Sequence, residues 1–331
     1  MNKFKFYFIL SITTLSLFSC SKNTDNTEIT PPRDYSVQYA TDLADIETYL
    51  KENYIDITAD QDVTITKIPV GGTQASIMSY LNSPTFPKLL SRDAKFHDIT
   101  YKLYYLVLSE GTGEKPSNAD GVFAAYKGEY LSSKTTDGVT TISSTFFEQS
   151  NNPQQVLSLQ SVISGWSEVF PQFRTGSYSS NTDGTVSYSG FGAGVMFIPS
   201  GLGYFASGSA SIPAYSPLVF SFKLFEIQRL DQDGDGIPSY LEDLDGDGYI
   251  YDYRNTINFP TKPATANPDD TDGDGIPDFL DVDDDGDGFS TKIEIKDPVT
   301  GLPYPFLSIP SCDGNTTNSA RIKKYLDKTC H

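Results

Sequence analysis

Histidine, cysteine and basic residues are scarce in this 331-residue chain. Its two histidines are His97 and His331, so a Ser-His-Asp or Cys-His catalytic group would depend on His97 almost alone. With three cysteines, the chain has little from which to build a Cys/His zinc site. Lys and Arg number 24 against 43 Asp and Glu, a net charge of −19, which argues against nucleic acid as a partner because phosphates bind basic faces.

Long hydrophobic runs are also lacking. The apolar run 6–18 is shorter than the roughly 20 residues of a membrane-spanning helix. It follows two lysines and ends in Leu17-Phe18-Ser19-Cys20, which resembles the lipobox of bacterial lipoproteins, whose cysteine is lipidated after cleavage. We therefore expect a signal peptide over 1–20 and a flexible tether over 21–33. A lipid on Cys20 is expected to anchor the exported lipoprotein at the outer membrane, on its periplasmic or surface face. An ordinary secretory signal is the alternative.

Two cysteines remain near the C-terminus, Cys312 and Cys330. An exported protein meets an oxidising compartment, so these two residues can form a disulfide that closes the tail over 295–331. Two unpaired thiols are the alternative.

Aromatic residues are plentiful, with 21 Tyr and 21 Phe, and 26 Gly and 20 Pro accompany them, which favours a β-rich fold. Residues 34–98 are expected to form an extension with one helix over 41–54 and a strand over 62–69. Thr41 is the predicted N-cap of that helix, and its apolar face contains the residues Leu43, Ile46 and Leu50.

Short strands are predicted from Tyr101 onward, over 102–108, 121–131, 195–198 and 218–227. Turn-rich insertions are expected to separate them at Ser132–Asp137 and Ser177–Gly194.

A series of ordered motifs runs through residues 99–230. The most specific is Val162-Ile163-Ser164-Gly165-Trp166, and the others, in chain order, are Gly111-Thr112-Gly113, Ala125-Tyr126-Lys127-Gly128, Phe147-Glu148-Gln149-Ser150, Phe197-Ile198-Pro199-Ser200 with Tyr204, Ile212-Pro213 and Leu218-Val219-Phe220. In order and spacing they resemble the FKBP-type peptidyl-prolyl cis–trans isomerases, in particular lipoproteins of Bacteroidetes-like bacteria. The resemblance implies an α+β fold in which a twisted antiparallel sheet wraps around a short helix at Trp166–Phe173.

The chemistry of such an enzyme explains these residue types. Rotation about an X-Pro bond has a barrier of about 18–20 kcal/mol, because the amide loses its resonance when it twists. The twisted amide has lost charge separation, so an apolar, water-poor pocket favours it without proton transfer or covalent chemistry. The resemblance implies Trp166 as the floor, Ile163 N–H and the Tyr204 hydroxyl as donors, and Glu148 beside the bond; the complete predicted pocket is Tyr126, Phe147, Glu148, Val162, Ile163, Trp166, Tyr204, Ile212 and Phe220.

Three residues depart from the family pattern, and one of them is Gln155, which falls near a position that is often aromatic. Glu148 is one methylene longer than the usual Asp, and Phe205 replaces a glycine that often follows the pocket tyrosine. On composition alone, an aromatic cluster is more often protein core than binding site, and only the order of the motifs reverses that preference.

An acidic region follows, over 231–294. Four copies of Asp-x-Asp-x-Asp-Gly begin at Asp231, Asp243, Asp270 and Asp283. Calcium binds six to eight oxygen atoms, and alternate aspartates on a loop that turns at a sixth-position glycine can converge on one ion. The loops resemble EF-hand loops locally and thrombospondin type 3 repeats in their tandem spacing.

This resemblance implies calcium as a structural ion, with no cofactor needed for catalysis, and a compact, stiff spacer when the metal is bound. An acidic, solvated linker is the alternative. Arg254 stands at the twelfth position of the second copy, which therefore departs from the pattern. The predicted ligands are Asp231, Asp233, Asp235, Ile237, Glu242, Asp243, Asp245, Asp247, Asp270, Asp272, Asp274, Ile276, Asp281, Asp283, Asp285, Asp287, Phe289 and Glu294, the Ile and Phe through their carbonyls.

The resemblance favours a prolyl isomerase that assists the folding of proline-containing exported polypeptides. Slow prolyl steps, which take tens of seconds, would make such catalysis useful. The alternative is a non-catalytic module that binds proline-containing peptides or acts as a chaperone, and that the calcium-stiffened repeats hold off the membrane.

Overall fold

The computed structural model describes residues 31–330, and Asp34–His331 forms one compact unit. The predicted signal peptide and lipidated Cys20 lie outside the described residues. Among residues 31–330, no helix combines the length and the hydrophobicity that crossing a membrane would require.

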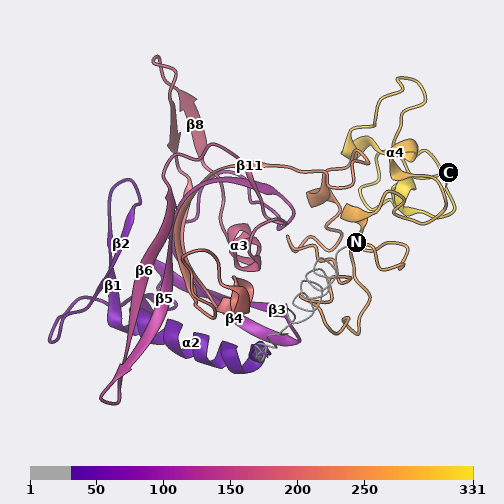
Figure 1. Ribbon diagram of the computed structural model, residues 1–331. Helices are drawn as coiled ribbons and strands as arrows, with labels where there is room; N and C mark the ends of the chain where they lie inside the picture. Colours follow the sequence, from indigo (N-terminus) through magenta and orange to yellow (C-terminus); the bar gives the residue numbers. More distant parts are fainter. Residues whose placement is uncertain (1–30, 331) are drawn as a thin grey trace, which may run out of the picture. The chain divides into compact units, whose positions relative to one another are not determined.

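A curled antiparallel sheet dominates this unit (Figure 1). Its strand order is β3-β4-β10-β11-β5-β6, and a short strand, β7, pairs with β5. The strands are β3 Lys88–Phe96, β4 Ile99–Ser109, β5 Gly121–Thr136, β6 Val139–Ser150, β7 Leu157–Ser158, β10 Gly192–Ile198 and β11 Leu218–Gln228. The architecture agrees with the expected mixture of helix and curled antiparallel sheet.

Both faces of the middle of the sheet are covered, so β10 is buried along its whole length. Side chains alternate between the faces, so Tyr105 packs with the inner cluster while Tyr104 packs with the outer one. The helix α3 (Ser164–Val169) lies inside the curl and contributes Trp166 to the inner cluster (Figure 1). The helix α2 (Tyr35–Glu52) packs Ile46 and Leu50 into the outer cluster, as predicted.

The start of α2 differs from the prediction. The helix begins at Tyr35 because the Asp34 side chain accepts hydrogen bonds from the N–H groups of Ser36 and Val37, at 2.8 and 3.2 Å. Thr41 lies inside the helix and is not its N-cap. The helix ends at Glu52, where β1 (Asn53–Ile57) begins and pairs with β2 (Val63–Lys67).

The two predicted insertions are hairpins. Residues 132–136 continue β5, which turns at Asp137-Gly138 and returns as β6, so the turn-rich insertion predicted at Ser132–Asp137 is wrong. Both turn residues have positive φ, at 51° and 78°, as a tight hairpin turn requires. Within 177–194, β8 (Ser177–Ser180) pairs with β9 (Val186–Ser189).

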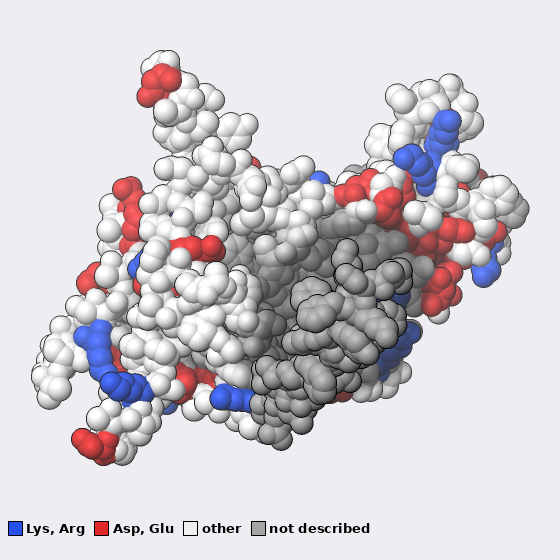
Figure 2. Space-filling view, viewed as in Figure 1, with Lys and Arg blue, Asp and Glu red and all other residues white. Residues whose placement is uncertain are grey.

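After β11 the chain forms loops and single turns, with one α-helix among the described residues there, α4 (Thr291–Glu294). Figure 2 shows acidic side chains gathered over this region, which Figure 1 colours orange to yellow. A small apolar cluster of Ile237, Ile295, Ile309 and Tyr325 stabilises it. Cys312 and Cys330 form a disulfide, with their Cα atoms 5.4 Å apart.

The acidic region also packs against the sheet. The carbonyl of Asn258 accepts a hydrogen bond from the N–H of His97, at 2.6 Å, and the rings of Phe259 and Phe96 stack with centroids 5.2 Å apart. The acidic region is therefore packed against the sheet domain that carries Trp166. A spacer would not need these contacts.

Candidate functional site

Four aromatic side chains from four elements meet at Trp166 of α3. The Trp166 ring lies edge-on to Phe220 of β11 and Tyr126 of β5, with ring centroids 5.1 and 4.9 Å apart. Phe147 of β6 meets Phe220 edge-on at 5.6 Å. Such perpendicular contacts are favourable because a positive ring edge meets a negative ring face.

The other predicted apolar residues belong to the same inner cluster. Trp166 and Ile212 are buried, with 4% and 7% of their surfaces exposed. The partly buried members among the predicted pocket residues are Tyr126, Phe147, Val162, Ile163 and Tyr204. The structure therefore brings together the predicted apolar and aromatic pocket residues, although the roles of the Ile163 N–H and the Tyr204 hydroxyl remain predictions.

Glu148 supplies the charge at this site. Its carboxylate lies near the hydroxyl of Tyr126. Burial, followed by the charge of Glu148, raises the pKa of Tyr126 to about 12 and also raises the pKa of Tyr204. The exposed carboxylate thus lies close to two pocket hydroxyls, both of which stay protonated at neutral pH.

A β-bulge places Phe147. On β6, Glu148 pairs with Gly128 and Phe146 pairs with Glu129, so Phe147 is the extra residue between them. Phe146 points to solvent while Phe147 packs inward. Gly128 leaves room for the rings, since a Cβ there would stand 2.8 Å from Phe220 Cε1 and from Phe147 Cε2.

His97 takes no part in this site. Its ring stacks on Tyr35 at 3.7 Å, and its Nδ1 lies 3.0 Å from the Tyr101 hydroxyl. Burial lowers the pKa of His97 to about 4, so the side chain is a neutral packing element at neutral pH.

Phe205 occupies the position where the family often has glycine. Its φ is 41°, in the left-handed region that glycine adopts more easily. Its ring stacks on Tyr35 of α2 at 4.0 Å. Contact with α2 therefore offsets the backbone strain beside Tyr204.

The acidic copies form four groups of carboxylates, each with ligand atoms within 4.8 Å of one another. The third and fourth groups contain only aspartates of their own copies, and the first and second groups each include an acid from outside their copy. The groups are Asp233, Asp235, Glu242 and Asp284; Asp243, Asp245 and Asp269; Asp270, Asp272 and Asp274; and Asp283, Asp285 and Asp287.

Sequence reasoning missed Asp284 and Asp269. Asp284 fills the spare second position of the fourth copy, and Asp269 directly precedes the third copy, so an extra acid beside each motif was the available signal. Four predicted carboxylate ligands lie outside the groups, and one of them is Glu294. Of the other three, Asp231 accepts from the N–H groups of Gly234 and Gly236, Asp247 from that of Tyr249, and Asp281 from that of Asp283.

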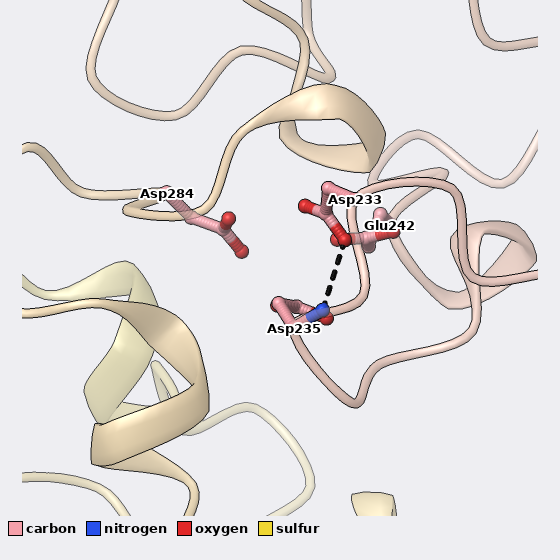
Figure 3. Close-up of side chains that lie close together, drawn as sticks. All are labelled: Asp233, Asp235, Glu242 and Asp284. Carbon is pink, nitrogen blue, oxygen red and sulfur yellow. Dashed lines mark hydrogen bonds between the residues drawn. The ribbon is translucent and has the colours of Figure 1, made fainter.

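The first group, whose four side chains Figure 3 draws, is the most buried of the four groups. Glu242 is 1% exposed, and neither of its carboxylate oxygens has a hydrogen-bond partner. Burial, followed by the charges of Asp235 and Asp284, raises the pKa of Glu242 to about 11. Carboxylates held this close need protons or a cation, and oxygen-only donors suit calcium.

Glu294 shows the same features beside the fourth group. Its carboxylate oxygens are buried without hydrogen-bond partners, and burial followed by Asp285 and Asp287 raises its pKa to about 8. Its role as the twelfth-position ligand stays a prediction. The carbonyls of Ile237, Ile276 and Phe289 remain predicted ligands.

A family model described as BamM C-terminal matches residues 232–319. The match covers the acidic region and part of the tail, and this family is not the thrombospondin type 3 family that the spacing resembles. No curated protein matches the chain.

Two solved structures are similar to the chain at low identity. A peptidyl-prolyl cis–trans isomerase from Pseudomonas syringae pv. tomato is 20% identical, with a TM-score of 0.32, over 60% of this chain and 99% of that one. FkpA from Escherichia coli is 21% identical, with a TM-score of 0.31, over 59% of this chain and 61% of FkpA. Likeness at this level says nothing about activity, so the function has to be inferred from the residues of the pocket.

Proposed function

We propose that the chain is a peptidyl-prolyl cis–trans isomerase that acts on proline-containing exported polypeptides. The observation that carries the proposal is the aromatic cluster, in which the single Trp of the chain contacts Tyr126 and Phe220 while Phe147 packs on Phe220. Glu148 lies near Tyr126.

The mechanism follows from desolvation of the amide. The proline ring would sit on Trp166, and the walls would exclude water from the X-Pro bond. A planar amide loses more hydration in such a pocket than a twisted one, because twisting removes its charge separation. The Tyr204 hydroxyl and the Ile163 N–H would hold the peptide, and Glu148 would interact with the twisting amide.

The test is cis–trans exchange of an X-Pro peptide with the unit Asp34–His331. We expect acceleration that falls at least about tenfold in a Trp166→Leu, Tyr204→Phe double variant, because the floor and one donor are lost. Tyr130→Phe, on the same strand as Tyr126, is the matched control and should keep the wild-type rate. A double variant as active as wild type would refute the assignment of this pocket.

Non-catalytic binding of proline-containing peptides is the second candidate. It is favoured by the side chain of Glu148, which is one methylene longer than the usual Asp, and by the positive φ of Phe205 beside Tyr204. Peptide binding without acceleration would establish this function in place of the first.

For the acidic region we propose calcium as a structural ion. Support comes from the buried, unpartnered carboxylate of Glu242 and its proximity to Asp233, Asp235 and Asp284. Calorimetric titration should show calcium uptake that Asp284→Asn reduces and Asp56→Asn, an exposed acid on β1, leaves unchanged. Absence of uptake by the wild-type chain would rule the ion out.

We also propose that the chain is attached to the outer membrane through lipidated Cys20. The lipobox-like sequence before this residue supports it, and the match of residues 232–319 to the BamM C-terminal family favours an outer-membrane-associated role. Growth with radiolabelled fatty acid should label the wild-type chain and leave Cys20→Ala unlabelled.

A further inference from the structure

The helix that carries the pocket floor is very short. α3 spans Ser164–Val169, and a helix of this length is marginal by itself, so tertiary contacts must set its orientation. Glu168, two residues after Trp166, is completely buried on this helix. A buried carboxylate of this kind needs partners, and those partners decide where the helix lies.

Two side chains from distant segments bind the Glu168 carboxylate. The Nε of Arg92 on β3 lies 2.9 Å from its Oε2, and the hydroxyl of Tyr251 donates to its Oε1 at 2.9 Å. Burial raises the pKa of Glu168, whereas the charge and the hydrogen bond of Arg92 lower it.

The segment that contains Tyr251 also binds the backbone of α3. The hydroxyl of Tyr249 donates to the carbonyl of Glu168 at 2.9 Å, and Gln172 donates to that hydroxyl at 2.7 Å. The guanidinium of Arg92 lies over the Tyr249 ring, 3.4 Å from its centroid. Arg92 is therefore held by Glu168 on one side and by an aromatic face on another.

Tyr249 and Tyr251 belong to the acidic region, directly after its second copy. The segment 249–259 is pinned to the sheet domain independently of Glu168. Asn118 bonds both the N–H and the carbonyl of Ile250, at 2.8 and 2.9 Å. Because the segment has its own attachment, it can act as a fixed support for the helix.

We propose that Glu168, Arg92 and Tyr251 are positioning residues for the prolyl pocket, and that segment 249–259 is part of the functional isomerase unit. This inference rests on the proposed isomerase function. The three side chains would fix α3, and through it the height and tilt of the Trp166 ring beneath the bound proline. They would not touch the substrate.

The test compares two conservative variants in the full chain. Tyr251→Phe removes one hydrogen bond to Glu168 and keeps the ring. Arg92→Lys keeps the charge but loses the planar guanidinium that contacts Glu168 and Tyr249. Tyr253→Phe is the matched control, because it removes a hydroxyl two residues further along the segment. Ile46→Val, in the outer cluster, controls for a general loss of stability.

Two readouts are measured, well below the melting temperature of each variant. The first is the emission of Trp166, the only Trp of the chain, in the free protein. The second is kcat/KM for an X-Pro peptide. We expect Tyr251→Phe and Arg92→Lys to shift the emission and lower kcat/KM about tenfold, which corresponds to about 1.4 kcal/mol. Both controls should match wild type in both readouts.

Unchanged emission and kcat/KM in Tyr251→Phe and Arg92→Lys would overturn the inference. An equal loss of kcat/KM in Ile46→Val would also overturn it, because the effect would then be general destabilisation. If the wild-type chain does not accelerate the exchange, the proposed function fails. Trp166 emission still decides in that case whether Tyr251 and Arg92 orient the helix.

Discussion

Gly128 faces the pocket from the middle of β5, between the rings of Phe147 and Phe220. We predict that Gly128→Ala changes both stability and activity. Its φ lies outside the left-handed region, so the backbone itself accepts alanine. If there were space for the methyl group, the smaller conformational entropy of the unfolded chain would stabilise the variant by about 0.4–1 kcal/mol.

Space is lacking at this position. The added Cβ would stand 2.8 Å from a carbon of each ring, so both rings must move. Overpacking of this kind costs about 1–3 kcal/mol, which exceeds the entropic gain and leaves a net destabilisation of about 1 kcal/mol. Because the displaced rings are pocket walls, we expect kcat/KM for an X-Pro peptide to fall about tenfold.

The matched control is Gly138→Ala, in the turn between β5 and β6. Gly138 has a φ of 78° and no neighbour within 4 Å of a built Cβ. Alanine there costs about 1–2 kcal/mol through the left-handed backbone alone, and the exchange rate should stay at the wild-type value. Urea unfolding and peptide exchange separate the two variants. If Gly128→Ala is more stable than wild type and equally active, the rings do not pack as described.

Three further predictions concern other parts of the chain. Chelation of calcium should lower the melting temperature, since calcium at about 100 times its Kd stabilises the folded chain by about 2.7 kcal/mol. Asp284→Asn should reduce this calcium-dependent shift, and Asp56→Asn should retain it. A wild-type melting curve that does not change with chelator would contradict the prediction. Because the pKa of His97 is lowered to about 4, the unfolded chain takes up a proton below about pH 6.5 and the folded chain only near pH 4. The free energy of unfolding should therefore fall by up to about 3 kcal/mol as the pH drops across this range. In His97→Gln, urea unfolding should show a weaker dependence of this free energy on pH, and an unchanged dependence would refute the role of His97. Phe205→Gly relieves about 1 kcal/mol of backbone strain but loses the ring stacked on Tyr35, so we expect a net loss of about 1 kcal/mol, and a gain in stability would show that the stack contributes little.

The pocket residues could be predicted from the sequence because both their types and their order along the chain match the motifs of one family. Trp166, Tyr126 and Phe220 lie far apart in the chain, yet each sits in a short motif whose spacing fits the family. The strands over 102–108, 121–131, 195–198 and 218–227 were predicted from runs of apolar and aromatic residues, whereas β3 and β6 were not predicted. The position of Phe147 at a bulge could not be read from alternation, because a bulge breaks the period of two.

Local signals were ambiguous where two residues could do the same work. Asp34 and Thr41 are both good N-caps, and the structure uses Asp34 because Tyr35 and Tyr39 also find packing partners on the sheet side. Likewise, the acidic repeats gave each loop its own aspartates but not Asp284, which reaches the first group from the fourth copy. Contacts between copies depend on how the loops stack, which spacing does not encode.

The contact between the acidic region and α3 has the largest consequence for function. Glu168 and Tyr251 are 83 residues apart, and neither sits in a motif, so no pattern linked them. A fragment that ends at residue 230 would keep every predicted pocket residue but lose Tyr249 and Tyr251, leaving the buried Glu168 with Arg92 and exposing Phe96. Removing one partner of a buried charge is strongly destabilising, so inactivity of such a fragment would not count against the pocket. The acidic region is better understood as a part of the isomerase unit than as a spacer behind it, and only the full unit can decide whether the pocket catalyses prolyl isomerisation.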